Sequence, residues 1–348
     1  MGYDLTSLGA FRDHGFDTVI DVRSPSEFAE DHVPGAINLP VLSDDERAMV
    51  GTVYKQESAF RARKIGAALV ARNAARHIET ALAEKDGSWR PLVYCWRGGQ
   101  RSGSFAAILG QIGWRVEVLS GGYRTYRRAV VSALYDDPWP GQVWILDGFT
   151  GTAKTAVLAR LGERGAQVID LEGLAEHRGS ILGGRAAPQP SQKAFESGIA
   201  AALAAFDPAR PVVVEAESSK VGDLIVPPAL WAAMSTAPRL VIEAPQAARA
   251  RYLARAYRDL AESPEMVCAL LERLVPYHGH AQVEEWQGLV RAGEAEVLAA
   301  SLIALHYDSR YARSRARAEA DQVETVSVAD LEEATLDRLA ETLIGRFT

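Results

Sequence analysis

The chain has 348 residues, and at about 100–200 residues per domain that length favours two domains over one. Hydrophobic residues make up 48% and charged residues 24%, which excludes disordered, collagenous and coiled-coil chains. The formal net charge of −7 repels nucleic acid, so an RNA partner would have to meet local basic patches. No apolar run could cross a bilayer and the first residues lack a secretory signal, so we expect a cytoplasmic protein without a membrane partner.

Two series of short apolar runs and helical patterns follow one another along the chain. The first series predicts strands at 18–22, 91–96 and 116–119, with helices at 26–30, 59–77 and 102–112. The second predicts strands at 142–146, 167–170, 211–215 and 239–243, with helices at 154–161 and 194–206 and then long helices to the C-terminus. Strands that alternate with helices indicate parallel sheets, so the expected fold class is α/β in both halves. A turn-rich segment at 135–141 separates them, and we expect domains at residues 1–137 and 138–348.

The first candidate site is a loop around one cysteine. The chain has only two cysteines, too few for a disulfide framework and without the spacing of a zinc site. Cys95 ends a predicted strand and opens a loop that leads into a helix, where backbone N–H groups and the helix dipole favour an anion. Arg97 and Arg101 add two positive charges, which favour the thiolate form. Gly98 and Gly99 let the backbone approach a bound oxyanion.

Four ordered motifs in this half resemble the rhodanese pattern. They are Asp21 to Phe28, His32 to Pro40, Tyr94 to Ser102 and Leu119 to Tyr123. The resemblance implies a rhodanese-like domain whose Cys95 carries a persulfide or perselenide, with Asp21 and Arg23 supporting the loop. Outside that context, a free cysteine at a strand end is more often a small buried core residue, which is the alternative interpretation.

The second candidate site is a glycine-containing loop after the strand at 142–146. Its order of strand, loop and helix is that of a phosphate-binding P-loop, and the alternative is a chance glycine-rich turn. The residues expected to hold phosphate are Gly148, Thr150, Gly151, Thr152, Ala153, Lys154 and Thr155. Lys154 would reach the outer phosphate oxygens, and the Thr155 hydroxyl would hold Mg²⁺. Ala153 departs from the pattern, because a glycine usually precedes the lysine.

Two carboxylates end later apolar runs, Asp170 and Glu215. Because α/β folds bind ligands at the carboxyl edge of the sheet, each of them is a candidate to contact the metal or its waters. Capping of a helix by the carboxylate is an equal alternative for each.

The order of the two modules and the motifs that join them resemble the bacterial tRNA 2-selenouridine synthase family over nearly the whole chain. The joining motifs are residues 51–56, 121–127, 171–180 and 215–218. The chain departs from the family pattern at Ala153, Ile181, Leu182, Ala216 and Ser219. The third motif holds His177 and Arg178, which the resemblance makes supporting residues of the site, although a lone histidine more often satisfies a local hydrogen bond.

This resemblance implies an enzyme, a transferase that converts wobble 2-thiouridine of tRNA to 2-selenouridine through an S-geranylated intermediate. Geranyl diphosphate and selenophosphate would be its substrates, with Mg²⁺ as a candidate ion and no redox cofactor. Alkylation turns the thiocarbonyl sulfur into a leaving group that a selenium nucleophile can displace. A P-loop suits the departure of diphosphate, and Cys95 would present the selenium.

RNA contacts are expected at basic patches. The candidates are Arg124 and Arg127 near the domain junction, Arg251, Arg255 and Arg258 on one helical face, and Arg310 and Arg313 further along. Stacking on neighbouring aromatic rings suits unpaired anticodon bases, while a solvated charged face is the alternative. The sequence leaves the oligomeric state open and is compatible with a monomer.

Three other functions stay open at this point. One is a rhodanese-type sulfurtransferase with a regulatory nucleotide-binding P-loop domain, and another is a small-molecule kinase fused to a rhodanese domain. The third is a non-catalytic RNA-binding adaptor, against which the intact Cys95, Arg97, Lys154 and Thr155 argue. Incubation with 2-thiouridine-containing tRNA and geranyl diphosphate distinguishes them by the nucleosides formed.

Overall fold

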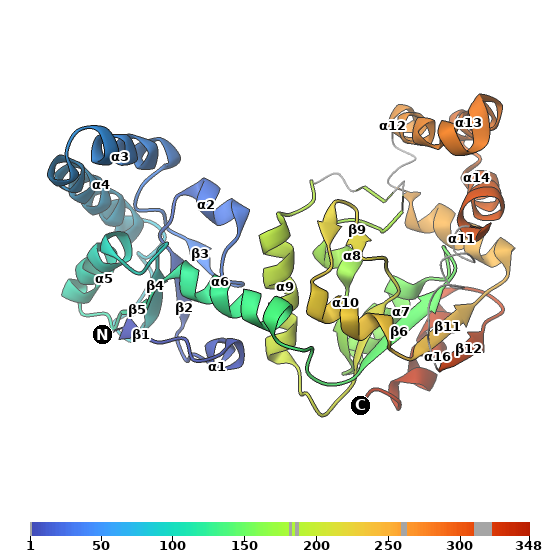
Figure 1. Ribbon diagram of the computed structural model, residues 1–348, viewed down its shortest axis with the longest axis horizontal. Helices are drawn as coiled ribbons and strands as arrows, with labels where there is room; N and C mark the ends of the chain where they lie inside the picture. The colour runs from blue at the N-terminus through green and yellow to red at the C-terminus, as the bar shows by residue number, and fades with distance from the viewer. Residues whose placement is uncertain (1, 181–182, 185–187, 259–262, 310–321) are drawn as a thin grey trace. The chain divides into compact units, whose positions relative to one another are not determined.

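The structure, a computed structural model, describes residues 2–180, 183–184, 188–258, 263–309 and 322–348. The chain divides into two compact units, of which the first comprises Met1–Pro138 and Pro190–Ala205 and the second Trp139–Gln189 and Phe206–Thr348 (Figure 1). Each unit is built on a five-stranded sheet. Within the described ranges, no helix has both the length and the apolar composition needed to span a membrane.

The sheet of the first unit has the strand order β1-β5-β4-β2-β3, and all neighbouring strands are parallel. Its strands are β1 (Gly2–Tyr3), β2 (Thr18–Asp21), β3 (Ile37–Asn38), β4 (Pro91–Tyr94) and β5 (Glu117–Leu119). Its helices are α1 (Leu8–Arg12), α2 (Pro25–Glu30), α3 (Asp44–Gln56), α4 (Ala59–Glu79), α5 (Gln100–Ile112), α6 (Tyr123–Val131), the π-helical η1 (Ser132–Asp136) and α9 (Gln192–Ala205).

Local sequence explains where these helices begin. Ser43 caps α3 and forms a capping box with Glu46, and Ser58 caps α4 by accepting a hydrogen bond from the N–H of Arg61. All four residues of β4 are buried, as expected for a central strand of a parallel sheet with both faces covered. The core packs α4 and α5 against the sheet through residues that include Val70, Phe105 and Leu109.

The sheet of the second unit has the order β12-β11-β6-β8-β7, again entirely parallel. Its strands are β6 (Val143–Gly148), β7 (Gln167–Ile169), β8 (Val212–Glu215), β11 (Arg239–Glu243) and β12 (Val323–Ser327), and a separate hairpin pairs β9 (Lys220–Val221) with β10 (Leu224–Ile225). Helices near the sheet are α7 (Lys154–Glu163), α8 (Leu171–Leu174), α10 (Pro228–Ser235), α11 (Gln246–Ala256) and α16 (Glu333–Ile344). The expected α/β class is therefore confirmed in both units.

A helical region follows α11 in the second unit. It comprises α12 (Pro264–Leu271), the 3₁₀ turn η3 (Glu272–Leu274), α13 (Val275–Ala292), α14 (Ala295–Leu302) and the π-helical η4 (Ile303–Tyr307). These helices have a core of their own around the fully buried Trp286, with Leu271, Leu274 and Val283 against it. The helical C-terminal region expected from the sequence is present, and α11 packs closely on α14.

The sequence prediction of helices alone after Glu243 is wrong at one point. Val323–Ser327 forms β12, which pairs in parallel with β11 along its full length. Four of its five residues are exposed, and Glu324, Thr325 and Ser327 are polar or charged, so the segment lacks the apolar run by which the other strands were recognised. It is an edge strand that the sheet supports through backbone pairing.

Both candidate loops occupy equivalent places in their sheets. The cysteine loop lies between the carboxyl end of β4 and the start of α5, and the second loop lies between β6 and α7. Each strand has neighbours on both sides in its sheet. Loops at the carboxyl edge of a central parallel strand present their backbone N–H groups to ligands, so the fold puts both sequences where an anion can bind.

Candidate functional site

The cysteine loop is fixed from outside by the turn before α6. The N–H of Tyr123 donates to the carbonyl oxygen of Cys95 at 2.8 Å, and the N–H of Arg124 donates to that of Trp96 at 3.2 Å. The glycines make this approach close, since a Cβ on Gly122 would lie 2.2 Å from the Cys95 carbonyl oxygen. Gly98 has φ +64°, and a Cβ there would lie 2.6 Å from the carbonyl oxygen of Leu119. The loop is therefore a rigid turn.

The thiol of Cys95 lies at the start of α5 and is almost fully buried, with 3% of the residue exposed. The hydroxyl of Ser102 donates to its sulfur at 3.1 Å. Burial raises the pKa of the thiol, but hydrogen bonds from the Ser102 hydroxyl and from the N–H groups of Ser102 and Arg97, together with the charge of Arg101, outweigh it. The pKa of Cys95 therefore lies below its ordinary value, which favours the nucleophilic thiolate.

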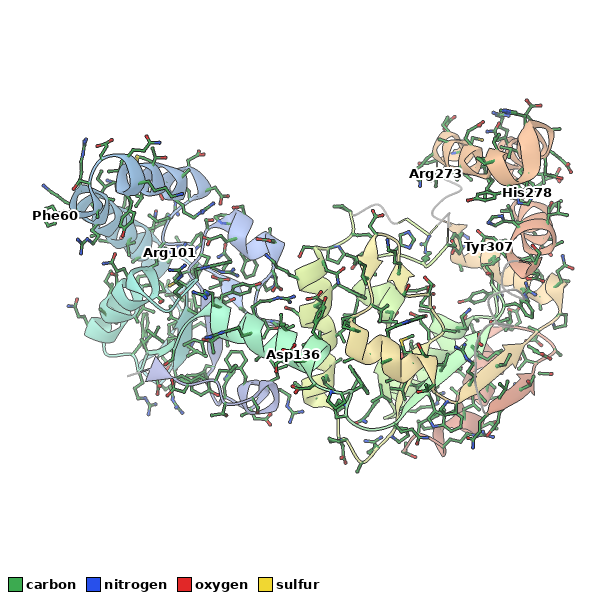
Figure 2. The ribbon with its side chains drawn as sticks, in the orientation of Figure 1. Phe60, Arg101, Asp136, Arg273, His278 and Tyr307 are labelled. Atoms are coloured by element: carbon green, nitrogen blue, oxygen red, sulfur yellow. The ribbon has the colours of Figure 1, made fainter. Side chains whose placement is uncertain are left out.

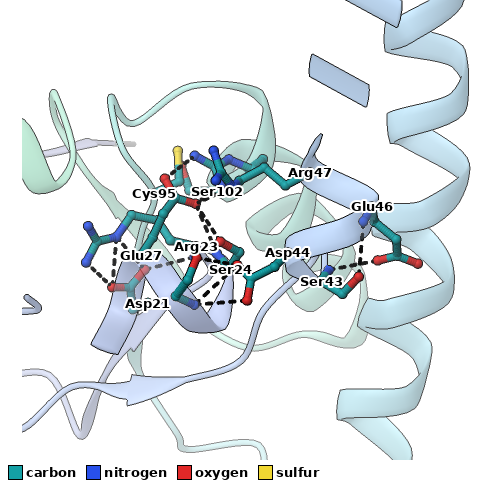
Figure 3. A network of polar contacts seen from close by, with 12 residues as sticks. Asp21, Arg23, Ser24, Glu27, Ser43, Asp44, Glu46, Arg47, Cys95 and Ser102 are labelled. Carbon is teal, nitrogen blue, oxygen red and sulfur yellow. Dashed lines mark hydrogen bonds and ion pairs between the residues drawn. The ribbon is translucent and has the colours of Figure 1, made fainter. Parts of the chain in front are cut away.

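Arg101 is held in place by Glu27 from α2. Its guanidinium donates to the two carboxylate oxygens of Glu27 at 2.7 and 3.4 Å, and Glu27 also accepts from the N–H and hydroxyl of Ser24 (Figure 3). Arg47 reaches the same carboxylate at 3.8 Å. Arg101 keeps 22% of its side chain exposed, so one face of the guanidinium meets solvent. Arg97 is exposed as a whole.

Asp21 and Arg23 form a buried pair beneath the loop. The guanidinium of Arg23 donates to both carboxylate oxygens of Asp21 and to the carbonyl oxygen of Asp31 at 2.6 Å. It also stacks on the ring of Tyr123, 4.0 Å from the ring centre. Since both side chains are 1% exposed or less, they cannot touch a substrate and instead connect β2 to the start of α6. Their supporting role stays a prediction.

The second loop has the geometry of a phosphate cradle. Lys154 donates from Nζ to the carbonyl oxygen of Gly148 at 2.9 Å, which folds the lysine back over the loop. The N–H and hydroxyl of Thr152 donate to the carbonyl oxygen of Phe149 at 3.2 and 2.9 Å. Arg249 of α11 donates to the carbonyl oxygen of Thr150 at 3.0 Å. These bonds fix the loop directly before the start of α7.

Ala153 adopts a left-handed backbone conformation, with φ 62° and ψ 27°. A glycine reaches this region without strain, whereas alanine is held there at a cost of order 1 kcal/mol. Ala153 is 4% exposed, and its methyl group packs in the core cluster of the second unit. The alanine thus keeps the backbone geometry of the glycine that the pattern calls for, and its side chain points into the protein.

Three glutamates surround Thr155. Its hydroxyl donates to Glu215 at 2.8 Å and lies within hydrogen-bond distance of Glu172, at 3.2 Å, and Glu217 is hydrogen-bonded to Glu172. Burial raises the pKa of Glu172 and Glu215 to about 8, and repulsion from the neighbouring carboxylates adds to this. Burial and the charge of Glu215 raise the pKa of Glu217 to about 7. The loop therefore has a cationic lysine on one side and a carboxylate cluster on the other.

This donor set suits a magnesium ion bound together with phosphate. Mg²⁺ prefers hard oxygen ligands and usually keeps several waters, taking one or two protein groups and phosphate oxygens. Among the described residues, no group of three or more acidic, histidine or cysteine side chains forms a cage that would hold a metal alone. Thr155 with Glu215 or Glu172 would hold the ion, which would neutralise diphosphate charge when bound.

A cavity of about 1050 Å³ opens above this loop. Its lining contains Thr150 to Ala156, Glu172, Arg178 to Ser180, Ala216 to Ser219, Trp231, Arg239, Tyr252, Leu253 and Tyr257. Ligand pockets commonly measure roughly 300–1,000 Å³, so this cavity is at the upper end of that range and is larger than one diphosphate needs. The cavity can therefore hold a second group beside the phosphate chain.

A second cavity of about 330 Å³ lies next to the first and is lined almost entirely by apolar groups. Its lining contains Leu253, Ala254, Pro264, Val267, Leu289, Val290, Ala295, Leu298, Ala299 and Leu302, with Arg258 at its border. Thr150, Leu253, Tyr257 and Tyr307 line both cavities, and Figure 2 labels Tyr307 in the helical region. The phosphate loop thus adjoins a pocket that suits a hydrocarbon chain.

Of the other expected site residues, Arg178 lines the first cavity, whereas Asp170 and His177 do not. Asp170 caps α8 by accepting from the N–H of Gly173 at 2.7 Å, which is the structural alternative weighed for it. His177 accepts from the N–H of Gly179 at 3.1 Å. Arg178 lines the cavity and stacks on Tyr257, 4.7 Å from the ring centre. The departures at Ile181 and Leu182 lie outside the described residues.

The arginines expected at the RNA differ in how they are held. Arg127 pairs with the buried Glu196, and Arg255 pairs with Glu332. Arg124, Arg251 and Arg258 are exposed. Arg310 and Arg313 lie outside the described residues. Pairing neutralises part of the positive charge that a phosphate contact needs, so the exposed arginines are the stronger candidates.

Sequence reasoning gave no role to several residues that shape these sites. Glu172 and Glu217 lie inside the joining motifs, so their positions after predicted strands could have identified them. Ser102 follows Arg101 at a helix start, which is a local signal for a sulfur contact. Arg249 has no such signal, because its partners Thr150 and Asp308 are 99 and 59 residues away in the chain.

Comparison with known proteins matches a different family to each half of the chain. Residues 6–129 match a family described as a rhodanese-like domain, and residues 141–272 match one described as a tRNA 2-selenouridine synthase AAA domain. The tRNA 2-selenouridine synthase of Nitrosomonas europaea is 34% identical over 235 residues, covering 66% of this chain and 61% of that protein. The tRNA 2-selenouridine synthase of Psychromonas ingrahamii is 35% identical over 243 residues, covering 70% and 65%.

The chain is also similar to solved structures over part of its length. A rhodanese-related protein from Thermoplasma volcanium is 16% identical, with a TM-score of 0.24, over 36% of this chain and 90% of that chain. The alignments to the two curated relatives span 61% and 65% of the relatives' own length.

Proposed function

We propose that this chain belongs to the tRNA 2-selenouridine synthase family and is a cytoplasmic transferase that replaces sulfur by selenium in wobble 2-thiouridine of tRNA. The match of residues 141–272 to the AAA domain of that family, the rhodanese-like match of residues 6–129 and the relatives that carry that name support the proposal. The reaction has two steps in this proposal. The second unit geranylates the sulfur with geranyl diphosphate, and the first unit uses selenophosphate to replace the geranylated sulfur.

The observation that carries the first step is the pair of adjoining cavities in the second unit. One contains the phosphate loop with Lys154 and Thr155, and the other is apolar. Geranyl diphosphate has these two parts in the same order, an anionic head and a hydrocarbon tail. A nucleotide would leave the apolar cavity unused, because a ribose and base placed there would lose their hydrogen bonds to water.

Lys154 and the N–H groups of the loop act on the leaving group. As the bond from carbon to the diphosphate oxygen lengthens, negative charge grows on that oxygen, and fixed positive groups stabilise it. The sulfur of 2-thiouridine attacks the same carbon. The remaining volume of the larger cavity, with Trp231 and Tyr257 in its lining, supports a place for the base beside the diphosphate.

The selenium step is assigned to the Cys95 loop. The lowered pKa of Cys95 supplies a nucleophile, and the start of α5 with Arg101 supplies an anion site for selenophosphate. Exposed Arg124, Arg251 and Arg258 are proposed to contact tRNA phosphates. A sulfurtransferase with a regulatory nucleotide domain would have no use for the apolar cavity.

The test is a reconstitution with defined components. An anticodon stem-loop that carries 2-thiouridine is incubated with the protein, geranyl diphosphate and Mg²⁺, and its nucleosides are identified by mass spectrometry. S-geranyl-2-thiouridine is expected first, and 2-selenouridine after selenophosphate is added. Formation of neither nucleoside, together with turnover of thiosulfate, would instead establish the sulfurtransferase.

A further inference from the structure

The spacing within the cysteine loop points to the chemistry it performs. Five residues separate Cys95 from Arg101, and Ser102 follows directly. The carbonyl groups of Cys95 and Trp96 are bonded to the turn before α6, whereas the N–H groups of Arg97 and Ser102 point to the sulfur. The sulfur of the nucleophile is thus approached by the N–H groups of Arg97 and Ser102 and by the Ser102 hydroxyl.

The guanidinium of Arg101 is a further donor beside these groups. Glu27 fixes Arg101 at 2.7 Å, and Ser24 holds Glu27 in turn, so Arg101 has one orientation relative to the sulfur. A phosphoryl group under in-line attack carries three equatorial oxygens around the line of attack. Several donors gathered about one thiolate match those oxygens better than they match a single selenium atom on the sulfur.

The electron balance of the selenium step also favours attack on phosphorus. In the proposed function, the selenium of selenophosphate attacks C2 of the uracil and geranylthiolate leaves, so the base then carries selenium that is still bonded to phosphorus. That selenium–phosphorus bond has to be broken. Transfer of selenium from selenophosphate to the cysteine as a perselenide would leave an electron pair on phosphorus and release phosphite, which is a reduction of phosphorus.

We propose that Cys95 is a phosphoryl acceptor, and that the loop dephosphorylates the selenium-substituted base. The thiolate attacks phosphorus, a sulfur–phosphorus bond forms, and the phosphorus–selenium bond breaks with its electron pair going to selenium. The products are 2-selenouridine and a cysteinyl phosphate. Water then attacks phosphorus, so that phosphate leaves and the thiolate returns, stabilised by the Ser102 hydroxyl 3.1 Å away. No oxidant or reductant is consumed.

This inference rests on the proposed function, and labelled selenophosphate tests it. The protein is given a geranylated stem-loop with selenophosphate that carries radioactive phosphorus or, in parallel, radioactive selenium, and is then denatured rapidly. Ser102→Ala slows return of the thiolate, so it should increase the protein-bound label. We expect that label to come from phosphorus, to disappear in Cys95→Ser and to persist in Cys268→Ser.

Vanadate provides a second test that needs no variant. Its trigonal bipyramidal form resembles phosphorus under attack, and such analogues bind at least about 100-fold more tightly than the ground state. Vanadate should therefore block selenation of a geranylated stem-loop far more strongly than phosphate does. Geranylation of 2-thiouridine in the same preparation is the control for nonspecific effects.

The possible failures can be told apart. If 2-selenouridine forms while the protein carries selenium and no phosphorus, Cys95 is a perselenide carrier and the inference is overturned while the proposed function stands. Full activity of Cys95→Ser, or indifference of selenation to vanadate, would overturn it equally. If neither geranylated nor selenated uridine ever forms, the proposed function fails and this inference fails with it.

Discussion

The two loops share a backbone plan and differ in the charges around it. Both follow a central parallel strand and open a helix, and both are tightened by glycines. Around Cys95 the neighbouring charges are arginines, and the pKa of the thiol is lowered. Around Lys154 the neighbours include Glu172, Glu215 and Glu217, whose pKa values are raised. One anion cradle therefore favours a nucleophile, and the other favours a phosphate chain that arrives with a cation.

The largest expected effect lies at the nucleophile. Cys95→Ser should reduce selenation about 1000-fold or more, because loss of a covalent nucleophile costs at least that much. Geranylation and displacement of the geranylated sulfur should continue, so the base whose selenium is still bonded to phosphorus accumulates in place of 2-selenouridine, and mass spectrometry of the nucleosides detects it. Cys268→Ser is the matched control, since Cys268 is buried among the helices of the second unit. Normal selenation by Cys95→Ser would contradict the assignment.

Removal of the lysine probes the other loop. Lys154→Ala should lower the rate of geranylation about 100-fold, because it removes a group that stabilises the departing diphosphate. Lys220→Ala is the control, since that lysine is exposed on β9. The rate is measured with 2-thiouridine stem-loop and geranyl diphosphate. An unchanged rate would exclude the loop from the alkylation.

Filling the apolar cavity tests whether the second unit, unlike the Cys95 loop, binds a hydrocarbon tail. Ala295→Trp places a large ring at the border of the cavity from an exposed position, so the fold should tolerate it. Geranylation should fall about tenfold, mainly through KM for geranyl diphosphate, as expected when a pocket loses volume. Val297→Trp, exposed on the same helix and outside the cavity lining, is the control. Equal KM in both variants would argue against a tail in this cavity.

A smaller effect is expected where Arg101 is oriented. Glu27→Gln keeps the shape of the side chain and removes the charge that holds the guanidinium. Selenation should fall about fivefold, less than for loss of a whole charged hydrogen bond, because the amide oxygen still accepts from Arg101. Glu57→Gln also breaks a contact with an arginine, Arg61, but on an exposed helix. Kinetics of the two variants on a geranylated stem-loop are compared. Identical rates would show that Glu27 has no part in the selenium step.

The carboxylates of the second unit give a pH dependence of stability. The pKa of Glu217 is raised from 4.5 to about 7 in the folded protein, so its contribution is favourable below pH 4.5 and is lost as the pH rises through 7. Glu217→Gln stays neutral and should therefore be more stable than wild type at pH 8, by at most about 3 kcal/mol, with a smaller gain at pH 5. Thermal unfolding without Mg²⁺ measures this. The exposed Glu163→Gln is the control, and an equal gain at both pH values would contradict the sign.

Much of the fold was predictable because its strands are short apolar runs between helical patterns. β4, β6 and β8 are central strands, and every position of β4 and β8 is buried. β12 was missed because an edge strand needs little apolar sequence when its neighbour supplies the backbone partners. The position of α9 in the first unit was also unpredictable, since it depends on contacts between residues far apart in the sequence.

The two sites, like the fold, were only partly predictable from the sequence. The two loops could be recognised from glycines, arginines and a lysine that are adjacent in sequence. The partner groups Glu27, Arg249 and Glu217 come from other elements, so only the folded chain brings them to the loops. The apolar cavity was harder to predict from the sequence. Its lining comes from α11 to α14, and each of those helices also has an ordinary core face.

The most direct test of the division of labour uses a premade intermediate. Lys154→Ala is given a stem-loop that already carries S-geranyl-2-thiouridine, together with selenophosphate, and the yield of 2-selenouridine is followed over time. Separate loops for separate steps predict selenation at the wild-type rate, since the lysine acts only before this point. Loss of selenation in this variant, with its fold intact, would mean that the phosphate loop is needed in both steps and would contradict that division.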